Sequence, residues 1–256
     1  MTPTPREVWQ FGTRHVGRKV LVYDCLPSTN DVAIELARDA THAGTVVAAD
    51  FQSAGRGQYG RAWHSRAGTS LLMSLVLAPP PACNRPVLLT AFAAVALGDA
   101  VRDMTGTTPS IKWPNDLLVG GRKLAGILIE QHGGTVVGLG LNLNQTEAEF
   151  AEANLHATSL GVLSGRPVDA ASVIGVALRR LDEHYAELLD GQLASLERAW
   201  GERMGLLHRH ARATLADGTY YTGRLTQLGF DAVEIELGDG AFVALRPETV
   251  RHLAEA

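Results

Sequence analysis

Cysteine is scarce in this chain of 256 residues, which has only Cys25 and Cys83. Two isolated cysteines exclude a disulfide framework and a cysteine-rich zinc site, so we expect buried, unreactive thiols and a cytoplasmic protein. The sequence also lacks the apolar core of a signal peptide after Met1 and any run of about 18 apolar residues. A soluble protein that is neither exported nor embedded in a membrane is expected.

Positive charge is not in excess, because Lys and Arg total 23, Asp and Glu total 27, and the net charge is −4. Nonspecific binding to nucleic acid depends on surplus basic residues, so this balance argues against DNA as a partner. Motifs of other common chemistries are also missing, namely His-Glu-x-x-His, a Gly-x-Ser-x-Gly elbow and zinc-type cysteine spacing. No metal-ligating side chains are therefore predicted.

Tight turns occupy the middle of the chain. Short apolar runs between Ile111 and Leu143 are separated by Gly120-Gly121 and Gly133-Gly134, pairs that accept the positive φ angles of hairpins. Neighbouring parallel strands need long crossovers, so this pattern excludes a purely parallel, doubly wound sheet. It predicts an α+β fold with a mixed, largely antiparallel sheet.

Flanking segments predict further elements, with strands over 19–26, 45–49 and 69–77 and helices from Val32 and over 84–103, 167–189 and 193–203. Ser28 to Asn30 are expected to cap the first helix, and Asn84 the second. Residues 144–159 show only weak periodicity. From about His208, short β-prone runs as far as Leu245 predict a small β-barrel, which suggests domains over 1–206 and 207–256.

A glycine-rich loop follows the second predicted strand. Gly55-x-Gly57-x-x-Gly60 matches the dinucleotide fingerprint, but no Asp or Glu occurs between Phe51 and Gly98 to bind a ribose. The loop also fails as a phosphate-binding P-loop, because Arg61-Ala62 replaces Lys-Ser or Lys-Thr. Its three arginines, Arg56, Arg61 and Arg66, favour a mobile lid over an anion. The alternative is a surface loop whose glycines only make turns.

Lys112-Trp113-Pro114-Asn115-Asp116 places a lysine at the end of a strand. Pro114 favours an extended Trp113 and Asn115-Asp116 a turn, so we expect Lys112 at a sheet edge facing a pocket. There its charge could position a phosphate, since unit charges about 4 Å apart interact by about 4 kcal/mol at an effective dielectric constant of about 20. The alternative is a solvated lysine beside a structural turn. Sequence chemistry alone also leaves Asn142 open, as a turn former or a ligand contact.

Several motifs together resemble those of the biotin protein ligases, also called biotin–[acetyl-CoA-carboxylase] ligases. In family order they are Ser28-Thr29-Asn30, Gln52 to Gly57, Gly60-Arg61-x-Trp63, Lys112 to Asp116, Lys123 to Leu128 and Gly138 to Asn142. The resemblance is close from Leu21 to Asn144. It implies a catalytic domain like that of class II aminoacyl-tRNA synthetases, followed by a small SH3-like β-barrel.

The resemblance also implies the reaction and the site. Biotin and ATP would give biotinyl-5′-AMP, with Mg2+ on the phosphates, and the biotinyl group would pass to a lysine of a biotin carboxyl carrier protein. Lys112 and Arg56 would be the catalytic residues. The biotin-binding residues would be Ser28, Thr29, Asn30, Gln52, Arg56, Gly57, Gln58, Trp63 and Lys112, and the ATP-binding residues Arg56, Arg61, Lys112, Lys123 and Asn142.

One position departs from the family pattern, because Gln58 stands where many members have Arg. Gln keeps hydrogen bonding but loses charge, so we expect the loop to close less firmly. About twenty residues precede the first core strand, too few for a helix-turn-helix, so the enzyme-only branch is expected. A lipoate–protein ligase and a noncatalytic adaptor remain alternatives, and the choice between monomer and homodimer stays open.

Overall fold

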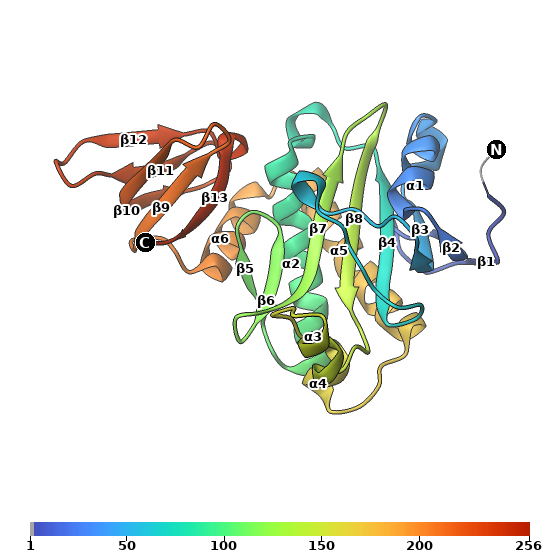
Figure 1. The fold of residues 1–256 in the computed structure, drawn as a ribbon. Helices are drawn as coiled ribbons and strands as arrows, with labels where there is room; N and C mark the ends of the chain where they lie inside the picture. Colours follow the sequence, from blue (N-terminus) through green and yellow to red (C-terminus); the bar gives the residue numbers. More distant parts are fainter. Residues whose placement is uncertain (1–2) are drawn as a thin grey trace.

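The computed structural model describes residues 3–256, and a large sheet forms its centre (Figure 1). Its strands are β1 Glu7–Trp9, β2 Lys19–Leu26, β3 Thr45–Gln52, β4 Ser70–Leu77, β5 Ser110–Lys112, β6 Asp116–Val119, β7 Arg122–Glu130 and β8 Thr135–Asn142. The order across the sheet is β1-β2-β3-β4-β8-β7-β6-β5. Only β2 and β3 pair in parallel among these strands, which confirms the mixed, largely antiparallel sheet. Of the predicted hairpin glycines, Gly120, Gly121 and Gly133 have positive φ, whereas Gly134 does not.

A second, five-stranded sheet comprises β9 His210–Leu215, β10 Tyr220–Leu228, β11 Val233–Glu236, β12 Phe242–Leu245 and β13 Val250–Glu255. Its order is β12-β11-β10-β9-β13, antiparallel throughout. This agrees with a small SH3-like unit. Strand β13 was not predicted, because a register shift between Val250 and His252 breaks the alternation of buried residues that identifies a strand.

The helices are α1 Thr29–Ala37, α2 Pro86–Thr105, α3 Glu147–Glu152, α4 Leu160–Ser164, α5 Ala170–Leu189 and α6 Leu193–Met204. The predicted cap at Asn84 is wrong, because α2 starts at Pro86 and the Asn84 side-chain oxygen accepts hydrogen bonds from Gln131 and Thr135. Ser28 is the N-cap position of α1 as expected, but its side chain makes no capping hydrogen bond.

Alternate residues of the strands face opposite sides of the large sheet. In β2, Val20 and Val22 join the main core with α2, whereas Leu21 and Tyr23 join a smaller cluster with α1. This is the two-residue period of a strand buried on both faces. Helix α1 therefore covers one face of the sheet, and α2 and α5 lie on the other.

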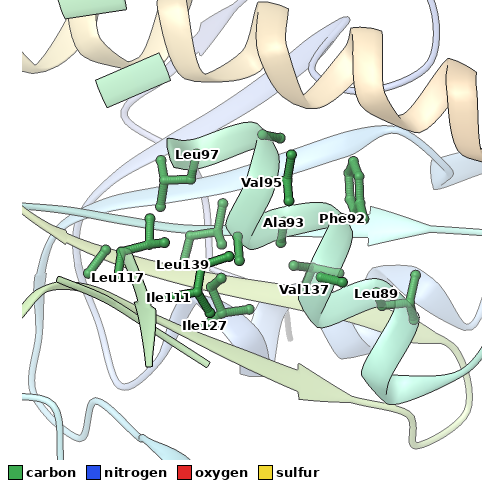
Figure 2. Close-up of a cluster of buried hydrophobic side chains, with 14 of the residues drawn as sticks. Leu89, Phe92, Ala93, Val95, Leu97, Ile111, Leu117, Ile127, Val137 and Leu139 are labelled. Atoms are coloured by element: carbon green, nitrogen blue, oxygen red, sulfur yellow. The ribbon is translucent and has the colours of Figure 1, made fainter. Parts of the chain in front are cut away.

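Helix α2 supplies much of the main core, as its apolar sequence predicted. Figure 2 shows Leu89, Phe92 and Leu97 of α2 together with Leu117, Val137 and other strand side chains. Every residue from Val87 to Val101 is buried. Because α2 fills this face, the other face is left for a binding site.

The two sheets are joined through one aromatic group. The ring centroids of Trp113 and Phe230 each lie 5.5 Å from the ring centroid of Trp200 in α6. The indole N–H of Trp113 donates a hydrogen bond of 2.9 Å to the carbonyl of Val250. The turn after β5 is thereby attached to the first residue of β13.

One of the two cysteine predictions is wrong. Cys83 is buried, and burial raises the pKa of its thiol, but Cys25 is exposed. Cys25 lies near the end of β2, where it and the preceding residue Asp24 are both exposed. Within residues 3–256, no helix is both long and apolar enough to cross a membrane.

A charged network connects α2, α5 and α6. Asp99 of α2 accepts hydrogen bonds from His184 at 2.8 Å and from Arg203 at 2.7 Å. The other ring nitrogen of His184 lies 3.0 Å from Glu187, so both nitrogens face carboxylates and the imidazolium form is favoured. Burial alone would lower the pKa of His184, but the hydrogen bond to Asp99 and the charges of Glu187 and Asp99 outweigh it and raise the pKa.

Stability should therefore depend on pH through His184. A pKa raised above 6.5 on folding contributes stability that is complete below pH 6.5 and is lost as the pH rises through the folded value. We expect the stability advantage of the parent over His184→Gln to fall as the pH rises above 6.5. Urea unfolding across this range measures it, and a difference that did not vary with pH would contradict the prediction.

Candidate active site

Three glycines hollow the face of the sheet that α2 leaves free. A Cβ atom at Gly140 would lie 2.8 Å from the Trp63 ring, and one at Gly126 would lie 3.1 Å from it. At Gly138 a Cβ would lie 2.4 Å from Oδ1 of Asn30. Side chains at these positions would displace Trp63 and Asn30, so the glycines of β7 and β8 make room for both.

A cavity of about 190 Å³ lies here. Its walls come from the start of α1, the end of β3, the glycine-rich loop, the turn between β5 and β6, and strands β7 and β8. The structure gathers in it ten predicted site residues besides Lys123: Ser28, Thr29, Asn30, Gln52, Arg56, Gly57, Gln58, Arg61, Trp63 and Lys112. Segments far apart in the sequence, from Ser28 to His252, thus converge on one hollow.

One wall of the cavity is a chain of hydrogen bonds. Oε1 of Gln52 accepts from the backbone N–H of Thr29 at 2.7 Å and lies 2.9 Å from its hydroxyl. Ser74 Oγ, fully buried, lies 2.7 Å from Oγ1 of Thr29 and 2.5 Å from Oδ1 of Asn30, and Nδ2 of Asn30 donates to Glu130 at 2.5 Å.

Glu130 sets the direction of this chain. An ionised carboxylate only accepts hydrogen bonds, so the amide group of Asn30 faces Glu130 and its oxygen faces Ser74. Ser74 must then donate its only proton to Asn30. The wall is consequently an ordered set of donors and acceptors suited to a neutral polar group. Ser74 and Glu130 were not predicted as site residues, because the sequences of their strands indicated only burial.

The glycine-rich loop is closed on itself beside the cavity. The N–H of Gly57 donates to the carbonyl of Arg61 at 2.7 Å, and the N–H of Trp63 donates to that of Gly55 at 2.9 Å. Arg56 forms ion pairs with Asp31 at 2.7 Å and Glu130 at 3.2 Å. Its hydrogen bond to Asp31 is the main cause that raises its pKa. Arg56 therefore fastens the loop to α1 and β7.

Lys112 ends the edge strand β5, as predicted, and lines the cavity. The turn after it is held twice, by Trp113 on Val250 and by Nδ2 of Asn115, which donates to the carbonyl of Ile127 at 2.6 Å. Within residues 3–256, no carboxylate lies within 4.0 Å of Lys112, so its charge is available to a ligand.

Lys123 has a different environment. Its Nζ lies 2.7 Å from Asp116 and 5.5 Å from the centre of the Trp63 ring. The chain has three lysines, and two of them, Lys112 and Lys123, line the cavity. The cavity therefore concentrates positive charge in a chain whose net charge is negative.

A second hollow of about 620 Å³ lies on the other side of Trp63 and Lys123, which line both spaces. Asn142 lines this second hollow and not the first. Nδ2 of Asn142 donates to the carbonyls of Lys123 at 3.3 Å and Thr158 at 3.0 Å. Asn142 thus holds the segment after α3 against β7.

The outer wall of the second hollow is α3, which the sequence analysis missed. A capping box starts this helix, with the Thr146 side chain accepting from the backbone of Glu149 and the Glu149 side chain accepting from that of Thr146. Thr-x-x-Glu is a recognisable helix start, so the signal was present. Arg66 of the glycine-rich segment pairs with Glu149 at 2.8 Å.

Replacing Gly140 by Ala should weaken binding in the first cavity. The new methyl would lie 2.8 Å from the Trp63 ring, and overpacking of this kind costs about 1–3 kcal/mol. We expect about a tenfold or greater rise in the dissociation constant for biotin, the ligand that the resemblance implies, measured by calorimetry. Gly238→Ala, where nothing lies within 4 Å of the new atom, is the matched control. Equal affinity in both variants would refute the role of Gly140.

Known proteins share this architecture. The solved structure of the biotin protein ligase from Aquifex aeolicus in complex with biotin and ATP aligns with a TM-score of 0.77 and 24% identity, covering 93% of this chain and 99% of that one. The large sheet, α1 and the cavity between them therefore define the fold of a biotin protein ligase.

Sequence comparisons agree. Residues 22–144 match the model of the "Biotin/lipoate A/B protein ligase family". The bifunctional ligase/repressor BirA of Bacillus subtilis is 34% identical over 221 residues, 83% of this chain and 68% of that protein. The biotin–[acetyl-CoA-carboxylase] ligase of Mycobacterium tuberculosis is 37% identical over 163 residues, 60% of this chain and 59% of that protein. The chain belongs to the biotin protein ligase family of enzymes.

Proposed function

We propose that this chain is an ATP-dependent ligase of the cytoplasm that forms biotinyl-5′-AMP and transfers the biotinyl group to a lysine of a biotin carboxyl carrier protein. The observation that carries the proposal is the meeting of an ordered polar wall, an arginine-bearing loop and the unpaired Lys112 in one cavity. The family relatives named above support it. The acidic net charge argues against a DNA partner.

The polar wall suits the ring of biotin, and Lys112 suits its carboxylate. Thr29, Asn30 and Gln52 present donors and acceptors in fixed directions, which a ureido group can match. A site built on such hydrogen bonds rejects analogues that lack them by up to about 10⁴-fold. Trp63 then packs against the aliphatic tail, over the glycines of β7 and β8.

In the first half-reaction, biotin in the first cavity reacts with ATP bound in the second hollow. A carboxylate oxygen of biotin attacks the α-phosphorus of ATP, and the bond to the pyrophosphate oxygen breaks. Lys112 offsets negative charge on the carboxylate and the α-phosphate. Arg56 and Arg61 approach the same charge from the loop. Such fixed charges stabilise a transition state without reorganising. In the second half-reaction, the uncharged amine of the acceptor lysine attacks the acyl carbon, the bond from that carbon to the phosphate oxygen breaks, AMP leaves and the nitrogen loses a proton.

The larger hollow is the place we propose for the adenosine of ATP. Lys123 borders both spaces, so its ammonium lies between the carboxylate site and the nucleotide site. Asn142 serves this site by fixing the backbone of Lys123 and Thr158. Magnesium would neutralise phosphate charge there. We propose that this ion is held mainly by the ATP phosphates and by water, as magnesium usually is.

Labelled pyrophosphate tests the activity. Exchange of the label into ATP that requires biotin supports a biotin ligase, exchange that requires lipoate supports a lipoate ligase, and no exchange supports a noncatalytic adaptor. Mass spectrometry of a carrier domain incubated with the protein, ATP, magnesium and biotin then tests transfer. Exchange with biotin but no modified lysine would overturn the transfer step alone.

Gln58 should set how firmly the loop holds the adenylate. Its side-chain oxygen is buried and has no hydrogen-bond partner within residues 3–256, so it adds neither charge nor a bond here. Gln58→Arg introduces a cation beside the phosphate, and charge-assisted hydrogen bonds contribute about 1.5–3 kcal/mol. We expect adenylate release to slow about tenfold or more, measured by rapid filtration. Equal release rates in parent and variant would refute the prediction.

We further propose that the chain has two domains. Residues 1–206 form the domain that binds biotin and ATP, and residues 207–256 form the SH3-like domain. The second part forms the smaller sheet, attached through Trp113, Trp200 and Phe230. Arg85 adds ion pairs to Asp231 at 2.8 Å and Glu248 at 2.9 Å. This attachment places β13 beside the cavity, because His252 lines it.

A further inference from the structure

Tyr59, at the tip of the glycine-rich loop, contacts the smaller sheet. The guanidinium carbon of Arg251 in β13 lies 4.6 Å from the centre of the Tyr59 ring. The ring of His252 is 6.5 Å from the same ring, at an angle of 57°. A cation within about 6 Å of an aromatic face is attracted by its negative charge distribution. The contact therefore joins the loop to the second sheet by a specific interaction.

The backbone of the loop is shaped for this contact. Tyr59 has φ 58° and ψ 36°, a left-handed conformation that side-chain-bearing residues rarely adopt, and Gly60 follows with φ 73°. Tyr59 is also 52% exposed, so no hydrophobic core holds it in this conformation. Besides the nearby ring of His252 and the backbone hydrogen bonds that close the loop, the interaction with Arg251 is a contact that holds Tyr59 in place.

Strand β13 is itself fixed relative to the reacting groups. Val250 accepts the hydrogen bond from Trp113, the residue after Lys112, and His252 lines the same cavity as Lys112 and Arg56. The strand thus touches both the turn that carries Lys112 and the tip of the loop. Movement of β13 would therefore change the distance between Arg251 and Tyr59.

The loop is attached on two sides of the cavity. Arg56 joins it to Asp31 and Glu130 on one side, and Tyr59 joins it to Arg251 on the other. In the part of the chain that the structure describes, no carboxylate lies within 4.0 Å of Arg251, so nothing competes for its charge. Gln58 brings no charge that could form an ion pair on this side of the loop. The contact of Tyr59 with Arg251 is therefore the second attachment.

We propose that Tyr59 and Arg251 are a positioning pair that holds the glycine-rich loop across the cavity and so controls retention of the acyl-adenylate. The proposal rests on the adenylate-forming function proposed above. The pair acts through the loop and touches no reacting atom. An exposed cation–π contact is expected to change the equilibrium of loop closure by about two- to fivefold.

Four variants test the pair: Tyr59→Ala, Arg251→Gln, both together, and Tyr59→Phe, which keeps the ring. The rate of adenylate release from the preformed complex should rise about two- to fivefold in each of the first two and no further in the double variant. Adenylate formation at saturating biotin and ATP should change less than release does. Tyr59→Phe should restore the parent rate.

A matched pair serves as the control. Tyr220 is 60% exposed and Arg212 lies 4.9 Å from its ring, but both are in the smaller sheet away from the loop. Tyr220→Ala should leave the release rate unchanged. If the increases in release rate caused by Tyr59→Ala and Arg251→Gln multiplied in the double variant, the two residues would not act as a pair. A Tyr59→Phe variant that released the adenylate as fast as Tyr59→Ala would also contradict the proposal.

Hydrogen exchange of residues 55–62 without substrates separates failure of the pair from failure of the proposed function. Both single variants should speed exchange in this segment equally, with no further increase in the double variant. If the parent formed no adenylate but showed this pattern, the function would fail while the pair stood. If adenylate formed and exchange were unchanged in every variant, the pair would fail while the function stood.

Discussion

Lys112→Ala should slow formation of biotinyl-5′-AMP by about 10²-fold or more. The expected size is that of removing one fixed, preorganised stabiliser of developing charge from an active site. Lys112 is the lysine of the cavity without a carboxylate within 4.0 Å in residues 3–256, whereas Lys123 is already paired with Asp116. Its full charge should therefore act on the reacting carboxylate and phosphate. Single-turnover assays with labelled ATP measure the rate.

Lys19→Ala is the natural control, since Lys19 is the third lysine of the chain and is exposed at the start of β2. It changes the net charge equally but leaves the cavity intact. Circular dichroism should show both variants folded, because Lys112 is also exposed. A folded Lys112→Ala protein that formed the adenylate at the parent rate would sink the assignment of the catalytic centre.

The sequence alone predicted the helices and hairpins whose signals lie within a few neighbouring residues. The hairpins at Gly120-Gly121 and Gly133 follow from glycines, which accept positive φ without steric cost, and α2 follows from its apolar length and Gly106. It also gathered the cavity residues, because the motifs that resemble the family supplied them as a set. Periodicity alone would have left Ser28 and Asn142 as a cap and a turn former.

The features that could not be predicted from the sequence depend on contacts between distant segments. Ser74 lies in a strand where every residue is buried, so nothing in β4 marks it as the hydroxyl that orders Asn30. Glu130 and Asp31 meet Arg56 only through the fold, and the balance of charge on the loop follows from that meeting. Likewise, β13 reaches the cavity only because Trp113 and Trp200 attach the smaller sheet.

Asp99→Asn should destabilise the protein by about 3–5 kcal/mol at pH 5, the typical cost of removing one partner from a buried ion pair. Asp99 is only 7% exposed, and Arg203, whose side chain is 11% exposed, would lose its carboxylate while still donating to the carbonyl of Val95. Urea unfolding measures the loss. Asp103→Asn, one turn further along α2 and paired at the surface with Arg180, should lose much less.

The effect of Asp99 should also depend on pH with a definite sign. Burial alone would raise its pKa, but hydrogen bonds from His184 and Arg203 and the charges of Arg203 and Arg102 lower it from 3.8 to about 2. A lowered pKa contributes stability that is complete above pH 3.8 and is lost as the pH falls through about 2. The gap between parent and Asp99→Asn should therefore be full at pH 5 and narrow below pH 3.8.

Loss of this network should reach the active site through α6. Arg203 anchors α6 to α2, where Gly98 leaves space that a Cβ would fill at 2.5 Å from the guanidinium. The same helix carries Trp200, which holds Trp113 and the smaller sheet. We expect Asp99→Asn to speed hydrogen exchange in β13 as well as in α6. Exchange that rose in α6 alone would show that the two sheets are coupled by Trp113 without help from α6.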